Sequence, residues 1–336
     1  MFQKMSSRPS YKIKELPLHK IDVYTMDSKK RYNDYASYLK KHFQNKMQKI
    51  TIHAGFSCPN RDGKISFGGC TYCNNQTFNP EYCQPNKSIT QQIDEGIQFF
   101  QKKYPYQRYL AYFQAYTNTY APLPILIQKY EEALAHPLVD GIIIGTRPDC
   151  IDHSLLQYLQ QIAKQHYVMI EYGIESTHNE TLELINRGHT YEVAEEAIRL
   201  TARYGIETCA HLILGLPNES EEIMLSHAQK ISQLPLNCIK LHQLQLIKGT
   251  KMAEQYTMHP EWFHLFTADE YIELLIRFIR QLNPSFVIER FVSQSPPSLL
   301  LTNGWGLKNY EFTAKLEKRM NQLNVHQGDY LLDQRN

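Results

Sequence analysis

Short apolar stretches alternate with amphipathic ones along most of the chain, and this alternation constrains the fold more than any other feature. Strand-like stretches rich in β-branched and aromatic residues occupy 49–53, 108–114, 139–145, 167–173, 208–214 and 238–244. Helical patterns occupy 88–103, 123–135, 153–165, 191–204 and 219–233. Strands that alternate with helices are parallel and are joined by right-handed crossovers. The sequence therefore predicts an α/β protein with six β-α units, two fewer than a closed eight-stranded barrel contains.

The pattern changes after residue 250. A helical pattern covers 267–281, a strand-like stretch covers 286–290, and a last helical pattern covers 310–323. We therefore expect three parts, which are a basic amino-terminal segment (1–48), the β-α units (49–250) and a smaller α+β extension (251–336) that packs on them.

The composition is that of an ordinary globular protein, with 42% hydrophobic and 21% charged residues. No apolar run approaches the roughly 20 residues that span a bilayer, and the amino terminus lacks the apolar core of a signal peptide. Seven cysteines, an odd number, argue against a disulfide framework. We therefore expect a cytoplasmic protein with no membrane partner.

Positive charge is concentrated near the amino terminus. Residues 1–49 contain twelve Lys and Arg and four acidic residues, whereas the net charge of the whole chain is only +2. Within this region Tyr32, Tyr35 and Tyr38 recur among basic residues, which suits a surface that contacts phosphates and bases. The alternative is an amphipathic helix with a solvated face, whose aromatic side chains dock on the body of the protein. Both interpretations stay open at this point.

Three cysteines follow the first predicted strand closely. Cys58, Cys70 and Cys73 have the spacing C-x11-C-x2-C, on a loop that contains three glycines. Thiolates grouped on such a loop are typical ligands of a soft metal or of an iron–sulfur cluster. Three thiolates leave one iron of a four-iron cluster open to a further ligand. The motif therefore predicts an iron–sulfur site with one open position.

A zinc site is the alternative for the same loop, with Cys83 or His53 as the fourth ligand. The distance along the sequence to Cys83 is not that of an ordinary zinc ribbon. Cys150, Cys209 and Cys238 lie in or beside apolar stretches, so we expect them to be small core residues.

The predicted strand ends point to one functional rim, because functional groups of parallel α/β proteins gather at the carboxyl ends of the strands. Here these ends lead into segments rich in polar residues and glycine, at 58–73, 114–120, 145–149, 173–176, 211–219 and 248–250. Lys240, Lys248 and Lys251 near the last of them are candidates to meet an RNA backbone or a substrate carboxylate, although rim lysines are often only solvated.

Several motifs together resemble the radical SAM superfamily. They are Cys58-Pro-Asn-Arg-Asp-Gly, Gly68-Gly-Cys-Thr-Tyr-Cys73, Tyr112-Phe-Gln-Ala-Tyr-Thr-Asn-Thr119, Gly145-Thr-Arg-Pro-Asp-Cys150, Ile185-Asn-Arg-Gly-His189 and Gly215-Leu-Pro217. The long first cysteine gap departs from the usual C-x3-C-x2-C spacing and resembles a bacterial branch, the MnmL/YhcC-like proteins. The resemblance covers about residues 30–325. It implies a partial (β/α)6 radical SAM barrel, a [4Fe-4S] cluster and S-adenosyl-L-methionine (SAM).

The resemblance also implies which residues hold these groups. Cys58, Cys70 and Cys73 would bind the cluster, and Tyr72 between the paired cysteines would approach the adenine of SAM. His211 matches a position that contacts the ribose.

Two charged residues match positions at the other end of SAM. Glu175 would contact the ribose or methionine part, although relatives carry glutamine there, and Arg187 would steady the carboxylate. A purely structural ion pair between the two is the alternative. Further pocket residues with less specific roles are Gln114, Thr117, Asn118 and Arg147.

The MnmL-like branch acts on the wobble uridine of tRNA. The resemblance therefore implies conversion of 5-carboxymethylaminomethyl-(2-thio)uridine at position 34 to 5-aminomethyl-(2-thio)uridine through a 5′-deoxyadenosyl radical. It also implies tRNA and a reducing donor such as flavodoxin or ferredoxin as partners. Two other functions stay open, a radical SAM oxidoreductase of a small metabolite or protein, and a noncatalytic nucleic-acid-binding module stabilised by zinc or a cluster.

Overall fold

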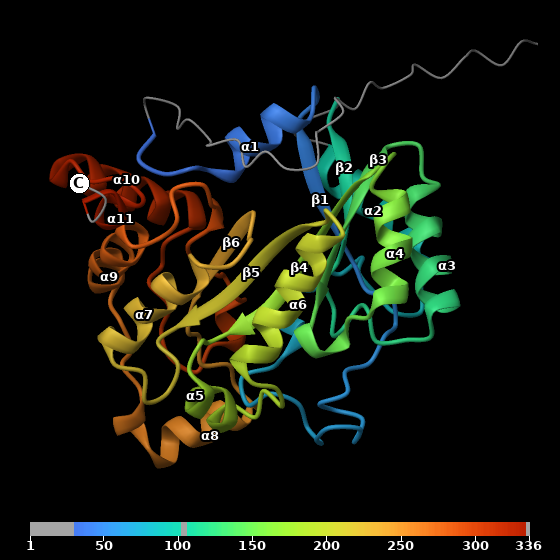
Figure 1. The fold of residues 1–336 in the computed structure, drawn as a ribbon. Coiled ribbons are helices and arrows are strands. Elements are labelled where there is room, and N and C mark those ends of the chain that lie inside the picture. Colours follow the sequence, from blue (N-terminus) through green and yellow to red (C-terminus); the bar gives the residue numbers. More distant parts are fainter. Residues whose placement is uncertain (1–29, 102–105, 334–336) are drawn as a thin grey trace, which may run out of the picture.

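The computed structural model describes residues 30–101 and 106–333, and within these ranges the strands form one parallel sheet (Figure 1). The strands lie side by side in chain order, so each pairs with the next one along the sequence. They are β1 (Met47–Ile52), β2 (Arg108–Phe113), β3 (Val139–Thr146), β4 (Tyr167–Glu175), β5 (Glu207–Leu214), β6 (Cys238–Gln243) and β7 (Val287–Arg290). The predicted parallel α/β partial barrel is confirmed.

Helices connect the strands and cover the outer face of the sheet (Figure 1). The helices that match predicted patterns are α2 (Ile89–Gln101), α3 (Leu123–Leu134), α4 (His153–Ile162), α6 (Tyr191–Arg203), α7 (Glu221–Ile231), α9 (Ala268–Arg280) and α10 (Asn309–Leu323). Helices too short for the sequence to reveal a clear helical period are α5 (Asn179–Leu184), α8 (Lys251–Met258) and α11 (Asp329–Asp333). Single 3₁₀ turns are η1 (Asn75–Thr77), η2 (Pro148–Cys150), η3 (Pro260–Trp262) and η4 (Pro297–Leu299).

Both faces of the strands are buried, which explains their near-continuous apolar sequence. In β3, Ile142 and Ile144 point outward and join the large apolar cluster under the helices, together with Leu126 of α3. Ile143 between them belongs to a smaller cluster inside the barrel, together with Leu110 of β2. Successive side chains of a strand point to opposite faces, so one strand supplies both cores.

Strand β7 extends the sheet beyond the six predicted units. It pairs with β6 in parallel, with Val287 opposite Cys238 and Ile288 opposite Ile239. The extension predicted for 251–336 therefore supplies a strand of the barrel itself, and the division of the chain at residue 250 stays a prediction.

Helix α1 (Tyr35–His42) lies across the amino ends of the strands (Figure 1). Tyr38 of this helix is only 4% exposed, and the Tyr38 hydroxyl contacts Glu207 and the Tyr167 hydroxyl. Tyr32 is equally buried and donates to Glu317. The docking interpretation therefore holds for these tyrosines, and they cannot stack on RNA bases while buried in this way. The rest of the basic segment, residues 1–29, lies outside the described residues.

Among the described residues, no helix combines the length and apolar character needed to cross a membrane. The long helix α10 has 15 residues, against the roughly 20 that a bilayer requires.

Candidate functional site

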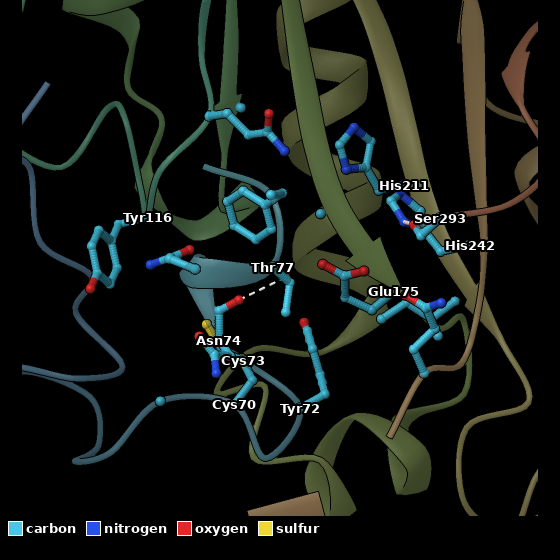
Figure 2. Close-up of a pocket in the computed structure, with 18 of the residues that line it drawn as sticks. Cys70, Tyr72, Cys73, Asn74, Thr77, Tyr116, Glu175, His211, His242 and Ser293 are labelled. Carbon is cyan, nitrogen blue, oxygen red and sulfur yellow. Dashed lines mark hydrogen bonds between the residues drawn. The ribbon is translucent and has the colours of Figure 1, made fainter. Parts of the chain in front are cut away.

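The cysteine loop follows β1 and lines a cavity at the carboxyl ends of the strands (Figure 2). Cys70 is buried, Cys58 and Cys73 are half-buried, and all three line this cavity of about 280 Å³. The loop turns through Gly68 and Gly69, whose φ angles of 82° and 86° lie in the left-handed region that favours glycine. The glycine-rich sequence between the cysteines is therefore what lets the loop wrap closely enough to bring them to one cavity.

The spacing of the sulfur atoms distinguishes the two predicted kinds of metal site. The ligand atoms of Cys58, Cys70 and Cys73 do not all lie within 4.8 Å of one another. Tetrahedral zinc would hold its thiolates about 3.8 Å apart, given Zn–S bonds of about 2.3 Å, whereas a four-iron cluster separates its thiolates on different irons. Cys83 is buried in the apolar core, and neither it nor His53 lines the cavity. This arrangement favours the iron–sulfur interpretation.

Positive charge surrounds the thiols. Arg187 Nη1 and Asn60 Nδ2 both donate to Cys70 Sγ, at 3.5 Å each. Burial, and next the neighbouring Cys70, raise the pKa of the Cys73 thiol to about 11, while Arg61 and Arg187 act against this rise. Iron binds the thiolate form, so the two guanidinium groups supply the charge that a set of buried thiolates needs.

A bulge at the end of β4 turns Glu175 into the cavity. Gly173 pairs with His211 of β5 and Glu175 pairs with Leu212, so Ile174 is an extra residue on β4. Glu175 has a φ angle of 69°. A side chain in this conformation costs on the order of 1–3 kcal/mol and is typical of ligand sites. The local backbone therefore gives up stability to place a carboxylate beside the cysteine loop.

Arg187 faces the same carboxylate, but the carboxylate does not fill the hydrogen-bonding capacity of its guanidinium group. Its Nη2 lies 3.9 Å from Glu175 Oε1 and donates to the Gly173 carbonyl oxygen at 2.5 Å. A Cβ atom on Gly173 would lie 2.5 Å from Glu175 Oε1 and 2.9 Å from Arg187 Nη2, so a larger residue here would require both side chains to shift. The Nε atom of Arg187 is buried and has no hydrogen-bond partner. The structural ion pair is thus long and incomplete, and the guanidinium can still bind a ligand.

The remaining predicted pocket residues also reach the cavity, with one exception. Tyr72, Gln114, Thr117 and Arg147 line it. Thr117 is 1% exposed and its Oγ1 has no partner. Asn118 does not line it, because its side-chain amide donates to the Gly145 carbonyl oxygen at 2.9 Å. The structure brings together every residue that the resemblance assigned to the cluster or to SAM, namely Cys58, Cys70, Cys73, Tyr72, Gln114, Thr117, Glu175, Arg187 and His211.

Inward-facing charges form a closed network at the bottom of the cavity. Lys49 Nζ lies 2.8 Å from Glu171 and 2.6 Å from Glu289, and Lys240 Nζ lies 2.6 Å from Glu171 and 3.1 Å from Glu289. His211 Nε2 is 2.8 Å from the second oxygen of Glu171. Burial disfavours the Glu171 carboxylate, but Lys240, Lys49 and His211 hold its pKa well below the usual range. Glu171 is therefore ionised, and the network sets two lysines against two glutamates.

The network corrects one expectation. Lys240 is 2% exposed and fully engaged with carboxylates, so it does not meet an RNA backbone. Lys248 and Lys251 are exposed, as solvated rim residues are.

Sequence reasoning missed several residues of the cavity wall, among them Glu171, Arg290 and Ser293. Figure 2 shows Ser293 with His242 and His211 on the far side of the cavity from Cys70, Cys73 and Tyr72, with Glu175 between the two groups. Arg290 is the last residue of the strand predicted at 286–290. Counting that strand as part of the barrel would have placed Arg290 at a functional strand end.

The residues present fit a [4Fe-4S] cluster and SAM. The three cysteine thiols lie on one wall of the cavity. Their sulfur atoms are farther apart than ligands of a single metal ion, and this spacing suits a cluster with three protein ligands. Buried polar atoms without a partner, Thr117 Oγ1 and Arg187 Nε, face the same space. Buried polar groups are normally paired, so these atoms indicate a polar ligand such as SAM.

Comparison with known proteins agrees with this geometry. The Radical SAM superfamily model matches residues 58–231, more than half of the chain, and the Radical SAM C-terminal domain model matches residues 236–322. Protein YhcC of Escherichia coli (strain K12) is 33% identical over 301 residues, which cover 89% of this chain and 96% of that protein.

More distant relatives share the barrel. The tRNA uridine(34) acetyltransferase of Methanocaldococcus infernus is 28% identical over 181 residues, which cover 53% of this chain and 32% of that protein. The solved structure of the archaeal Methanocaldococcus infernus Elp3 with an N-terminus deletion is similar in fold, with a TM-score of 0.62 at 16% identity over 84% of this chain and 64% of that one. The chain belongs to the radical SAM superfamily, whose enzymes use a [4Fe-4S] cluster and SAM.

Proposed function

We propose that this radical SAM enzyme modifies tRNA, converting 5-carboxymethylaminomethyl-(2-thio)uridine at wobble position 34 to 5-aminomethyl-(2-thio)uridine. The observation that carries the chemistry is the convergence of Cys58, Cys70 and Cys73 with Glu175 and Arg187 on one cavity. The substrate is supported by similarity to a protein named for tRNA uridine(34). A wobble uridine lies in a single-stranded loop, so it can enter a pocket at little unpairing cost.

The chain's own residues divide the work within the cavity. Cys58, Cys70 and Cys73 hold the cluster, and Arg187 and Glu175 bind and orient the charged end of SAM. When bound by these residues, the cluster and SAM would together supply 5′-deoxyadenosyl radical chemistry for hydrogen-atom abstraction.

A one-electron reductant is the second partner that this chemistry requires. We include a flavodoxin or ferredoxin in the proposal, because the reduction of a low-potential cluster needs such a donor. The cysteine loop lies at the open end of the barrel, and Phe67 and Phe78 beside it are 75% and 39% exposed. This edge is where a small redox protein would come closest to the cluster.

Mass spectrometry of tRNA nucleosides tests the substrate. We would compare total tRNA from a strain lacking the gene, its parent, and the deletion strain carrying either the wild-type gene or the Cys70→Ala variant. The proposal predicts that carboxymethylaminomethyl-(thio)uridine accumulates in the deletion strain and that aminomethyl forms return only with the wild-type gene.

An unchanged nucleoside profile would remove the tRNA substrate but not the radical chemistry. The purified, iron-loaded protein separates the two, because it should form 5′-deoxyadenosine from SAM and dithionite whatever its substrate is. If 5′-deoxyadenosine forms while the tRNA is unchanged, a small metabolite or a protein becomes the substrate to seek.

A further inference from the structure

The barrel interior contains one positive charge more than its buried network can neutralise. Lys49 and Lys240 are each within 3.1 Å of both Glu171 and Glu289, so these four charges cancel. Arg290 lies directly beside them and lines the cavity. Its contacts within the described residues are to a histidine ring and not to a carboxylate.

A bulge in β7 explains how the extra charge reaches the interior. Ile288 pairs with Ile239 of β6, but Lys240 pairs with Arg290, so Glu289 is an extra residue on β7. In a regular strand, successive side chains point to opposite faces, whereas a bulge re-aims them. Glu289 therefore joins the lysines inside the barrel while Arg290, the next residue, also faces the cavity.

The groups around Arg290 leave its charge intact. Arg290 Nη2 lies 3.2 and 3.3 Å from the two ring nitrogens of His242, and His242 Nδ1 contacts the Ser293 hydroxyl. Burial, followed by Arg290, His211 and Lys240, keeps the pKa of His242 well below its usual value, so the ring is neutral. Arg290 Nε is buried without a hydrogen-bond partner. The guanidinium of half-buried Arg290 therefore has no anionic partner among the described residues.

We propose that Arg290, held by the His242 ring that Ser293 contacts in turn, is the carboxylate-binding subsite of the substrate pocket. A planar carboxylate matches the fork of a guanidinium and forms charge-assisted hydrogen bonds with it. His242, which contacts Arg290, and Ser293 lie across the cavity from Cys70 and Cys73 (Figure 2), so a substrate bound through Arg290 extends from the far wall toward the cluster side. Resting on the proposed function, the group bound is the carboxylate of the carboxymethylaminomethyl substituent.

The first test compares two uridine ligands that differ in one charge. Calorimetry with the iron-loaded enzyme would measure the binding of 5-carboxymethylaminomethyluridine and of its neutral carboxamide. The wild type should prefer the acid by at least about tenfold, since hydrogen bonds to charged groups contribute roughly 1.5–3 kcal/mol. Arg290→Gln should lose this preference, and Arg290→Lys should keep part of it because it retains the charge but not the fork.

The matched control is Arg199→Gln, which removes an exposed arginine paired within helix α6. It should bind both ligands as the wild type does. Circular dichroism and iron content of each variant separate a lost subsite from a lost fold. An acid preference that persists in folded Arg290→Gln would overturn the proposal.

A second probe keeps the subsite testable if the uridine assignment is wrong. Trifluoroacetate carries a carboxylate and no uridine, and its ¹⁹F signal broadens when it binds protein. Broadening that is present in the wild type and Arg199→Gln but absent in Arg290→Gln would support the subsite, even where neither uridine ligand binds. Equal broadening in Arg290→Gln and the wild type, or none in the wild type, would overturn it.

Discussion

The bottom and the rim of the barrel interior both contain buried charge, but they treat it differently. At the bottom, Lys49, Glu171, Lys240 and Glu289 satisfy one another at 2.6–3.1 Å. At the rim, Glu175 and Arg187 stay 3.9 Å apart, on a backbone with a left-handed glutamate and with a guanidinium nitrogen that has no partner. The difference teaches that complete pairing marks the part of the interior that holds the fold, and incomplete pairing marks the part that awaits a ligand.

The largest expected effect is at the cysteines. Cys70→Ala should abolish iron binding and 5′-deoxyadenosine formation, because a cluster with three protein ligands cannot spare one. Cys83→Ser is the matched control, since Cys83 is buried away from the cavity. It should keep its iron content even if it is less stable. Iron content by ferrozine assay and nucleoside chromatography check both. Loss of iron in Cys83→Ser would instead indicate a metal site with Cys83 as a fourth ligand.

Breaking the bottom network should cost stability rather than ligand binding. Lys240→Met leaves two buried glutamates with one lysine, and removing one partner of a buried ion pair typically costs about 3–5 kcal/mol. Lys315→Met is the control, because its pair with Asp269 is exposed and should contribute less than about 1 kcal/mol. Urea unfolding measures both. Similar losses in the two variants would contradict the view that the network holds the fold.

The rim should show the opposite pattern. Glu175→Gly relieves a strained backbone, so the free energy of unfolding should stay the same or rise by up to about 1 kcal/mol. SAM affinity should fall by about tenfold, the scale of one hydrogen bond to a charged group. Asn218→Gly, at another left-handed position with φ of 62°, should gain similar stability without any loss of SAM affinity. A marked loss of stability in Glu175→Gly would mean that the rim carboxylate is structural.

The last expected effect is a pH dependence of the stability that comes from a single side chain. His242, packed against Arg290, His211 and Lys240, with Glu171 acting the other way, has a pKa held well below 6.5. The unfolded chain therefore binds a proton near pH 6.5 that the folded chain does not. The free energy of unfolding should fall below pH 6.5 by up to about 1.4 kcal/mol per pH unit. In His242→Gln, the fall in the free energy of unfolding that His242 causes below pH 6.5 should be absent. Urea unfolding at pH 7.5, 6.5 and 5.5 compares the two, and parallel profiles would refute the assignment.

Much of the fold could be predicted from the sequence, because six short apolar stretches separated by helical patterns allow few arrangements. The short helices α5 and α8 could not, since fewer than three turns show no clear period. The cysteine motif predicted where the site lies, and the structure brings the predicted SAM residues to the same cavity.

Features that arise between strands could not be predicted. The bulges at Glu175 and Glu289 depend on which residues pair across neighbouring strands. The closed charge network depends on four strands facing one interior, so Lys240 reads along the sequence as an ordinary rim lysine although it is buried. Arg290 was missed for the same reason, because its strand was assigned to the extension and not to the barrel.

The bulge in β7 makes this strand sensitive to a change in chain length. Deleting Glu289 would restore regular pairing and place Arg290 where the glutamate now stands, between Lys49 and Lys240. Three cations would then face one another with only Glu171 of the present network to offset them. A one-residue deletion here would therefore be harsher than most substitutions, and related chains that keep the network should show no gap at this point of an alignment.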